Sequence, residues 1–116
     1  MAYGMVDVAT VSQAPGLHPA ASAYDKGVGA ALGVQAFGLY QVELPPRAET
    51  IPHDHIDDGA EDVYAVIRGE GIVFVDGEGV PVKTGQFIAV TPDSSRFVRA
   101  GDGGLAFIAV CATPPG

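Results

Sequence analysis

The chain has 116 residues, enough for one domain with a single hydrophobic core and too few for two. Hydrophobic residues make up 47% of the sequence and charged residues 17%, a composition typical of globular rather than disordered proteins. Fourteen acidic residues against six basic ones give a net charge of −8. Most of the surface would repel a phosphate backbone, so we expect no nucleic-acid partner.

No apolar run approaches the roughly 20 residues that span a bilayer, so no membrane partner is expected. Residues 1–13 lack the basic start and continuous apolar stretch of a signal peptide. The single cysteine, Cys111, cannot form an internal disulfide, which is typical of a reducing compartment. These features predict a cytoplasmic protein.

Glycines and prolines, 16 and nine in number, divide the chain into short segments. Residues 1–33 are predicted to be an irregular N-terminal segment with room for one edge strand, and residues 34–116 to be the β domain. Strands are predicted, in chain order, at 33–44, 62–68, 71–77, 78–85, 86–92, 95–101 and 104–112. A turn at 69–71 separates the second strand from the third.

Valine, isoleucine and phenylalanine dominate these segments, and such residues suit a pleated, half-buried surface. No window after residue 34 has the spacing of an amphipathic helix. Short strands at intervals of about eight to twelve residues are typical of a sandwich or a barrel, so the predicted fold class is all-β.

Two of the three histidines, His53 and His55, lie one residue apart and are followed by acids. On a strand such residues point to the same face about 7 Å apart, so both imidazoles could bind one cation. A carboxylate from a neighbouring strand would complete a facial triad for non-haem iron or a similar metal. Glu61 and Asp62 are the candidates, and alternation lets only one face inward. By itself the histidine pair is a weak signal, since both rings could be solvent-exposed.

Residues 53–71 resemble the first motif of the cupin family, in which G-x5-H-x-H is followed by E-x6-G. Asp62 stands at the place of the family's glutamate ligand, because Gly69 follows it after six residues, and Arg47 replaces the first glycine. The resemblance covers about residues 34–113. It implies a small single-domain, jelly-roll-like β-barrel with a pocket, often a divalent metal such as Fe, Mn, Ni or Zn, and frequently a dimer.

The second cupin motif, G-x5-P-x-G-x2-H-x3-N, is kept only in part. Gly85 matches its glycine, but Arg96 replaces its histidine ligand, which leaves open two alternatives, a divalent metal and no metal at all. A guanidinium about 5 Å from a divalent cation is repelled by about 7 kcal/mol at an effective dielectric near 20. In one arrangement Arg96 replaces the metal and forms a bidentate pair with Asp62. In the other the metal stays on His53, His55 and Asp62, and Arg96 binds the acid group of an anionic ligand.

The predicted barrel-lining residues are Tyr64, Val66, Phe74, Ile88 and Val98. Of these, Tyr64 and Phe74 are also expected to contact the ligand, together with Arg96. Cys111 falls in an apolar strand, where burial is expected rather than reactivity. His18, in the irregular segment, is a weaker candidate for a substitute metal ligand.

Three functions are compatible with these residues. The first is a metal-dependent enzyme acting on a small anionic metabolite, although no general base stands out and the reaction is left open. The second is a metal-free ligand-binding or sensor protein with Arg96 as the anion anchor. The third is a structural module with a vestigial pocket. Under each, a homodimer is expected, because the apolar residues 5–11 could add to a neighbour's sheet edge.

Overall fold

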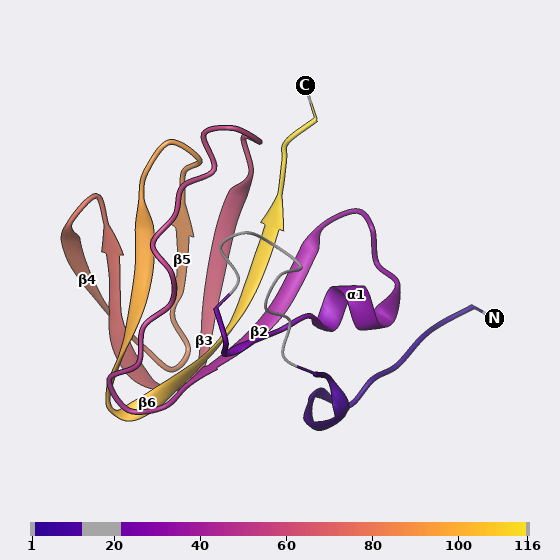
Figure 1. Cartoon of the computed structure of the whole chain (residues 1–116), viewed down its shortest axis with the longest axis horizontal. Coiled ribbons are helices and arrows are strands. Elements are labelled where there is room, and N and C mark those ends of the chain that lie inside the picture. Colours follow the sequence, from indigo (N-terminus) through magenta and orange to yellow (C-terminus); the bar gives the residue numbers. More distant parts are fainter. Residues whose placement is uncertain (1, 13–21, 116) are drawn as a thin grey trace.

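The structure, a computed structural model, describes residues 2–12 and 22–115. Its strands are β1 (Asp25–Lys26), β2 (Gly38–Leu44), β3 (Glu61–Val75), β4 (Glu78–Lys83), β5 (Phe87–Val90) and β6 (Arg96–Ala112). They form one antiparallel sheet in the order β1-β2-β6-β3-β4, with β5 paired to β3 (Figure 1). The predicted all-β, jelly-roll-like class is confirmed. The sheet curls strongly but is not closed, since within the described residues β1 and β4 remain its two ends.

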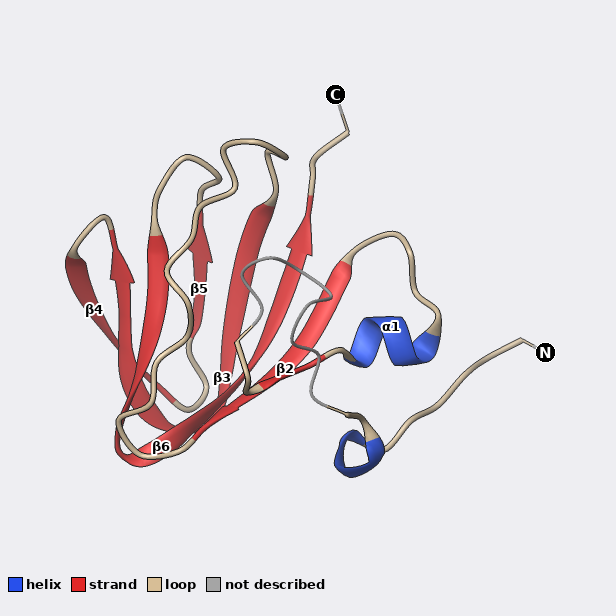
Figure 2. Cartoon of the chain, viewed as in Figure 1, coloured by secondary structure: helices blue, strands red, loops and turns tan. Residues whose placement is uncertain are grey.

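Two short helical segments, η1 (Val8–Thr10) and α1 (Val28–Leu32), precede β2 (Figure 2). α1 ends at Gly33, whose left-handed φ of 76° suits a residue without a Cβ. Among the described residues, no helix is long and apolar enough to cross a membrane.

β3 and β6 are long, bent strands, so the prediction of four short strands and a turn at 69–71 is wrong. The ladder between them continues past the glycines, with shifts in register at Val66/Arg68 and Gly69/Gly71. Gly69 has a φ of 77°, and a Cβ there would lie 2.3 Å from the carbonyl oxygen of Gly104. Glycine lets the two backbones approach closely while both strands bend, so the chain does not need to leave the sheet.

The register shifts change which face of β3 points to the core. Tyr64 and Val66 are buried before the shifts, and Val73 is buried after them at 1% exposure. Inward positions therefore change from even to odd numbers, because the shift at Val66/Arg68 adds one residue to β3 and a single extra residue reverses the alternation. Phe74, predicted to line the barrel, lies on the other face instead. There its ring stacks on Phe97 with centroids 4.6 Å apart.

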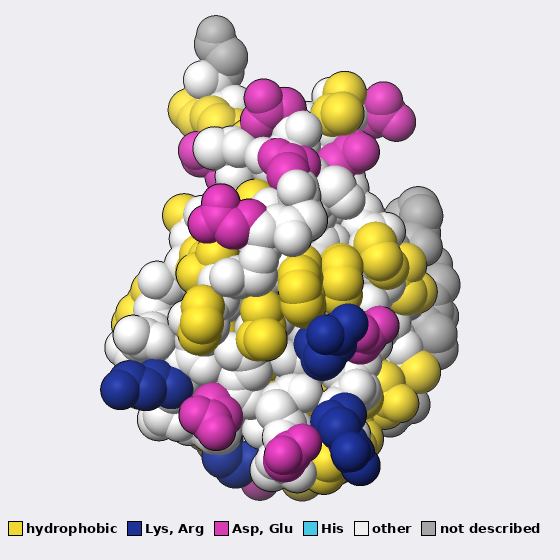
Figure 3. Space-filling model, turned by 90° about the vertical axis from the view of Figure 1, so that its left-hand side faces the viewer, with side chains coloured by type: hydrophobic (Ala, Val, Ile, Leu, Met, Phe, Trp, Pro, Cys, Tyr) yellow, Lys and Arg dark blue, Asp and Glu magenta, His cyan; other side chains and the backbone are white. Residues whose placement is uncertain are grey.

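One side of the molecule, where β4 lies, carries a band of hydrophobic side chains, with acidic side chains gathered above it (Figure 3). The outer aromatic pair is covered in part by a cation, since the Arg99 guanidinium lies 4.8 Å from the Phe74 ring centroid.

The core lies between the two halves of the curled sheet. Its buried residues are Val42, Leu44, Tyr64, Val66, Val73, Val82, Val98, Ala100, Leu105, Phe107 and Ala109. Ile88 is partly buried against this cluster, so four of the five residues predicted to line the barrel do pack inside it.

The sequence predicted that the two histidines lie on a strand, but they lie outside the named strands. They belong to an irregular segment, residues 45–60, which runs alongside the strands as a long tan chain in Figure 2. This segment follows the first half of β6 through isolated bridges. In one of them the His53 N–H donates to the Arg96 carbonyl oxygen at 3.0 Å, and the Arg96 N–H donates to the His53 carbonyl oxygen at 2.8 Å. The His55 N–H donates to the carbonyl of Pro92 at 2.9 Å. The backbone thus fixes His53 beside Arg96.

Candidate functional site

His53 and His55 are held through the same ring nitrogen. Nδ1 of His53 lies 3.0 Å from the carbonyl oxygen of Ile51, and Nδ1 of His55 lies 3.1 Å from Oδ1 of Asp58. A carbonyl oxygen can only accept, so His53 carries its proton on Nδ1 and keeps a lone pair on Nε2. Burial lowers the pKa of His53, outweighing the opposing effects of Ile51 and Asp62, and this also favours the neutral ring.

Both Nε2 atoms are directed at one carboxylate oxygen. Oδ2 of Asp62 lies 3.9 Å from Nε2 of His53 and 3.3 Å from Nε2 of His55. The two imidazoles meet edge to face, with centroids 5.0 Å apart. Asp62 is 4% exposed on β3, whereas Glu61 is exposed on the other face, as alternation predicted.

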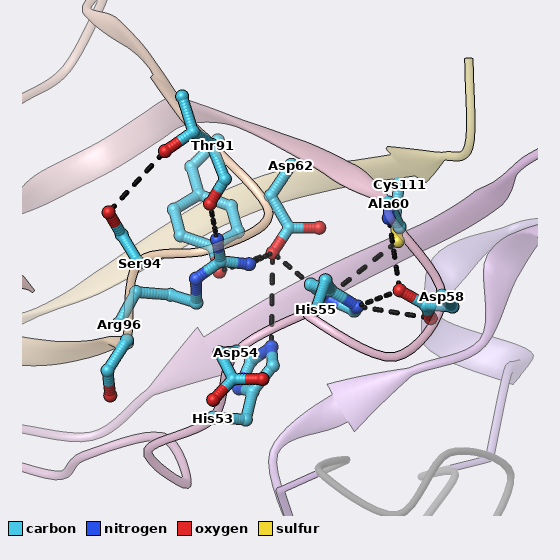
Figure 4. Close-up of polar contacts among 12 residues, drawn as sticks. His53, Asp54, His55, Asp58, Ala60, Asp62, Thr91, Ser94, Arg96 and Cys111 are labelled. Atoms are coloured by element: carbon cyan, nitrogen blue, oxygen red, sulfur yellow. Dashed lines mark hydrogen bonds and ion pairs between the residues drawn. The ribbon is translucent and has the colours of Figure 1, made fainter.

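The same oxygen of Asp62 also accepts hydrogen bonds from Arg96 and Tyr64. Nη1 of Arg96 donates to it at 2.7 Å, and the Tyr64 hydroxyl donates at 3.2 Å. Figure 4 shows Arg96 and the two histidines approaching Asp62 from different sides. Burial, followed by the charge of Asp62, raises the pKa of Tyr64, so this phenol remains a donor at any ordinary pH.

Arg96 is fully buried, with 0% of its surface exposed. Besides the bond to Asp62, its Nη2 donates to the carbonyl oxygen of Thr91, while its Nε has no hydrogen-bond partner among the residues that the structure describes. The bidentate arrangement predicted that Arg96 contacts both carboxylate oxygens of Asp62. In the structure the ion pair uses only one of them, Oδ2. The four residues 53, 55, 62 and 96 therefore do converge, with Arg96 as the fully enclosed member.

Three of these side chains offer ligand atoms with spacing suited to a metal ion. The ligand atoms of His53, His55 and Asp62 lie within 4.8 Å of one another. Ligands bound to one ion at about 2.1 Å lie about 3.0–3.5 Å apart, so small side-chain movements would close this set around a cation. A hydrogen bond from the second ring nitrogen to an acceptor, as made here to Ile51 and Asp58, is the usual support of a metal-bound histidine. The residues therefore fit a divalent metal.

A cavity of about 250 Å³ opens beside these groups. Its lining residues are Asp25, Gly38, Tyr40, Val42, Thr50, His53, His55, Asp58, Asp62, Tyr64, Phe107, Ala109 and Cys111. Tyr64 lines the cavity, as predicted for a ligand contact, whereas Phe74 and Arg96 do not. All six lysines and arginines lie within the described chain, and none of them lines this cavity, so its charged walls are carboxylates.

Cys111 lies opposite Asp62 in the register of β3 and β6 and lines the cavity half-buried, with Sγ 4.0 Å from Nε2 of His55. Burial raises the pKa of its thiol to about 12, with the negative charge of Asp62 acting in the same direction. The thiol is therefore protonated, in agreement with the expected lack of reactivity.

Sequence reasoning missed three of the titratable lining residues. Asp58 stands three residues after His55, a spacing that could have suggested a support for the ring. Asp25 and Tyr40 come from β1 and β2, and nothing near them in the sequence indicates that they meet the histidines. His18, the weaker metal-ligand candidate, lies outside the described residues.

Comparison with known proteins agrees with this geometry. The sequence model of the cupin-domain family matches residues 40–111. A cupin protein from Bacteroides fragilis superposes with a TM-score of 0.79 at 19% identity, over 100% of this chain and 88% of that one. A sugar phosphate isomerase from a cupin superfamily, from Silicibacter pomeroyi, gives 0.75 at 20% identity over 97% of this chain and 77% of that one.

A third structure, the plu4264 protein of Photorhabdus luminescens, gives a TM-score of 0.70 at 18% identity, over 97% of this chain and 88% of that one. At these identities the likeness concerns the fold alone. No curated protein matches the sequence.

Proposed function

Since the chain belongs to the cupin family, we propose that its cavity binds a small molecule through a divalent metal held by His53, His55 and Asp62. The observation that carries this proposal is the arrangement of the two rings. Each has Nδ1 held by an acceptor and Nε2 directed at Asp62, so two ring nitrogens and a carboxylate converge on the place that one cation would take.

Two imidazoles and one carboxylate suit Fe, Mn, Ni or Zn, and the donor set does not select among them. When bound, such an ion supplies Lewis acidity and polarises an oxygen of the ligand. The chain's own residues orient that centre, since Asp58 and the Ile51 carbonyl hold the two rings, and Tyr64 holds Asp62. We assign no reaction, because every polar group at the centre already serves as a ligand or as a support.

Arg96 affects this site through its ion pair with Asp62, although it does not line the cavity. A bound ion would share the carboxylate with the guanidinium, and their repulsion of about 7 kcal/mol at about 5 Å would weaken metal binding. The same positive charge favours an anionic group of the ligand at the metal. Because Arg96 does not line the cavity, we propose that it acts on this group through the electrostatic potential and through Asp62, and not by direct contact.

A metal-free binding site is the second candidate. The buried ion pair between Arg96 and Asp62 favours it, since the guanidinium already supplies the positive charge that this carboxylate requires. A structural module with a vestigial cavity would share the same ion pair.

Metal content separates these candidates. We would purify the protein without an affinity tag and measure bound metal for the wild type, for His53→Ala, for Arg96→His and for Asp57→Asn as a control on the exposed loop. The proposal expects metal in the wild type and the control, loss in His53→Ala, and tighter uptake in Arg96→His. No uptake by the wild type from added Fe, Mn, Ni or Zn would reject the metal and leave the second candidate.

We further propose a homodimer in the cytoplasm. Supporting it are large apolar side chains exposed outside the cavity, notably Met5 at 87%, Phe87 at 75% and Ile67 at 44%. Light scattering after gel filtration should give the mass of two chains, and the mass of one chain would contradict the dimer. Cell fractionation tests the location.

A further inference from the structure

Cys111 faces the same space as the proposed metal ligands. It is the direct cross-strand partner of Asp62 in the register of β3 and β6, and both side chains line the cavity. Residues directly opposite each other on neighbouring strands project to one face of the sheet, with Cβ atoms about 4.5–5.5 Å apart. A thiol and a carboxylate placed in this way can both reach a single ion between them.

The sulfur atom lies close to the position of a metal-bound thiolate. Sγ of Cys111 is 4.0 Å from Nε2 of His55, the ring nitrogen that is also 3.3 Å from Oδ2 of Asp62. An ion bound tetrahedrally, at about 2.3 Å from sulfur and about 2.1 Å from nitrogen, holds those two atoms about 3.6 Å apart. A small rotation of the thiol would therefore bring the sulfur and the nitrogen to one ion. Figure 4 draws the contact between Cys111 and His55 beside Asp62.

Gly38, on the other side of Cys111, leaves room for this rotation. It pairs with Cys111 in the register of β2 and β6 and also lines the cavity. A Cβ at Gly38 would lie 3.5 Å from the Cβ of Cys111 and 3.1 Å from the ring of Tyr40. Any side chain at this position would therefore crowd the thiol, and glycine keeps that part of the cavity wall low.

The charges at the site favour a second anionic ligand. His53, His55 and Asp62 present ligand atoms within 4.8 Å of one another, so the metal site is indicated without the cysteine. The single negative charge of this set is already paired with the buried Arg96. A divalent ion would thus add two positive charges that these ligands do not offset, in a place where Asp62 is 4% exposed. A thiolate would offset one of them.

We propose that Cys111 is the fourth protein ligand of the metal, bound as a thiolate whose proton is released to solvent. The inference rests on the proposed function, because it requires the ion on His53, His55 and Asp62. It goes beyond that function by selecting the metal, since a thiolate is a soft donor that favours Zn²⁺ over Mn²⁺. A coordinated thiol is deprotonated outright, so a thiol that is protonated without metal agrees with this role. Zn²⁺ can expand from four ligands to five, which leaves a position for the small molecule.

Cobalt(II) reports thiolate ligation directly. The chain has one cysteine, so a thiolate-to-cobalt charge-transfer band in the near ultraviolet can come only from Cys111. Metal-free protein would be titrated with Co²⁺ under anaerobic conditions, and the bound cobalt would be measured per chain. The wild type should bind cobalt and show an intense band, and so should Asp57→Asn on the exposed loop. Cys111→Ser should lose the band.

Metal affinity separates a ligand from a thiol that merely lies nearby. Cys111→Ser should weaken Zn²⁺ binding by about tenfold or more and Mn²⁺ binding by less than about threefold, because only the soft ion gains from sulfur. The comparison is made between variants, since nitrogen ligands favour Zn²⁺ over Mn²⁺ even without a thiolate. Circular dichroism checks that Cys111→Ser is folded, and the spectrum of the wild type tests the inference independently of any variant.

The two proposals fail in different measurements. Cobalt bound by the wild type without the charge-transfer band would overturn the role of Cys111 and leave the metal on His53, His55 and Asp62. Equal losses of Zn²⁺ and Mn²⁺ affinity in Cys111→Ser would overturn it as well. Absence of any cobalt or zinc uptake by the wild type would overturn the metal site itself and this inference with it.

Discussion

Replacing Asp62 by asparagine should leave a buried arginine without its anion. Arg96 is 0% exposed and pairs with the Oδ2 atom of Asp62 at 2.7 Å, with a backbone carbonyl as its other partner. Removing one partner of such a pair costs about 3–5 kcal/mol, because the remaining charge cannot regain its water. We therefore expect Asp62→Asn to be among the most destabilising single substitutions in this chain.

The expected loss corresponds to a large change in melting temperature. At about 2.1 cal/mol/K per residue, 116 residues give an unfolding entropy of about 0.24 kcal/mol/K. A loss of 3–5 kcal/mol then lowers the Tm by about 12–20 °C. Thermal unfolding followed by circular dichroism in the presence of a chelator measures this, because removal of metal keeps a lost ligand from adding to the effect.

Removing the arginine of this pair should lower the free energy of unfolding less than removing the aspartate. Arg96→Met leaves Asp62 with the hydrogen bond from Tyr64 and facing the cavity, where water can reach its carboxylate, so we expect a loss of about 1–3 kcal/mol. The double variant Asp62→Leu with Arg96→Met removes both charges and should be more stable than Asp62→Asn. A double variant more stable than Asp62→Asn would show that the loss of stability in Asp62→Asn comes from the unpaired charge of Arg96.

A surface pair of similar geometry serves as the control. Arg99 and Glu49 lie 2.6 Å apart with 45% and 44% of their side chains exposed, so Glu49→Gln should cost about 0–1 kcal/mol. A Tm for Asp62→Asn within about 2 °C of the wild type, or a double variant no more stable than Asp62→Asn, would refute the reasoning.

Two further substitutions test the bend and the support of the carboxylate. Gly69→Ala should cost about 3–5 kcal/mol in unfolding measurements, because it combines a φ of 77° with a Cβ 2.3 Å from the Gly104 carbonyl oxygen. Gly77→Ala shares the positive φ, at 85°, but has open space, so it should cost about 1–2 kcal/mol, and equal losses would contradict the clash. Tyr64→Phe removes one donor to Asp62 and should lower stability by about 1–2 kcal/mol, and an unchanged Tm would show that this bond contributes nothing.

The histidine pair shows how far local reasoning extends. The sequence placed His53 and His55 beside Asp62 on the strength of spacing and family resemblance, and the structure brings their ring nitrogens to one oxygen. The reason given, a regular strand, is wrong, since the segment is joined to β6 through isolated bridges. The extended backbone was enough to direct both side chains to one side.

Arg96 was the decisive departure from the family pattern, and the sequence left its role open. Its orientation depends on the backbone pairing with His53 and on burial, which place the guanidinium against Asp62 and outside the cavity lining. Asp25 and Tyr40 were missed because they reach the cavity from strands that are adjacent to it only in the folded sheet.

The sequence alone determined the all-β class, because alternation and the placement of glycine and proline are local properties of the chain. Alternation allowed only one of Glu61 and Asp62 to face inward, and the family resemblance selected Asp62. Tertiary structure decided which strands merge, which face Phe74 takes and what lines the cavity. The register shift at Val66/Arg68 adds one residue to β3 and reverses its alternation, and a reversal of this kind depends on pairing with a distant strand.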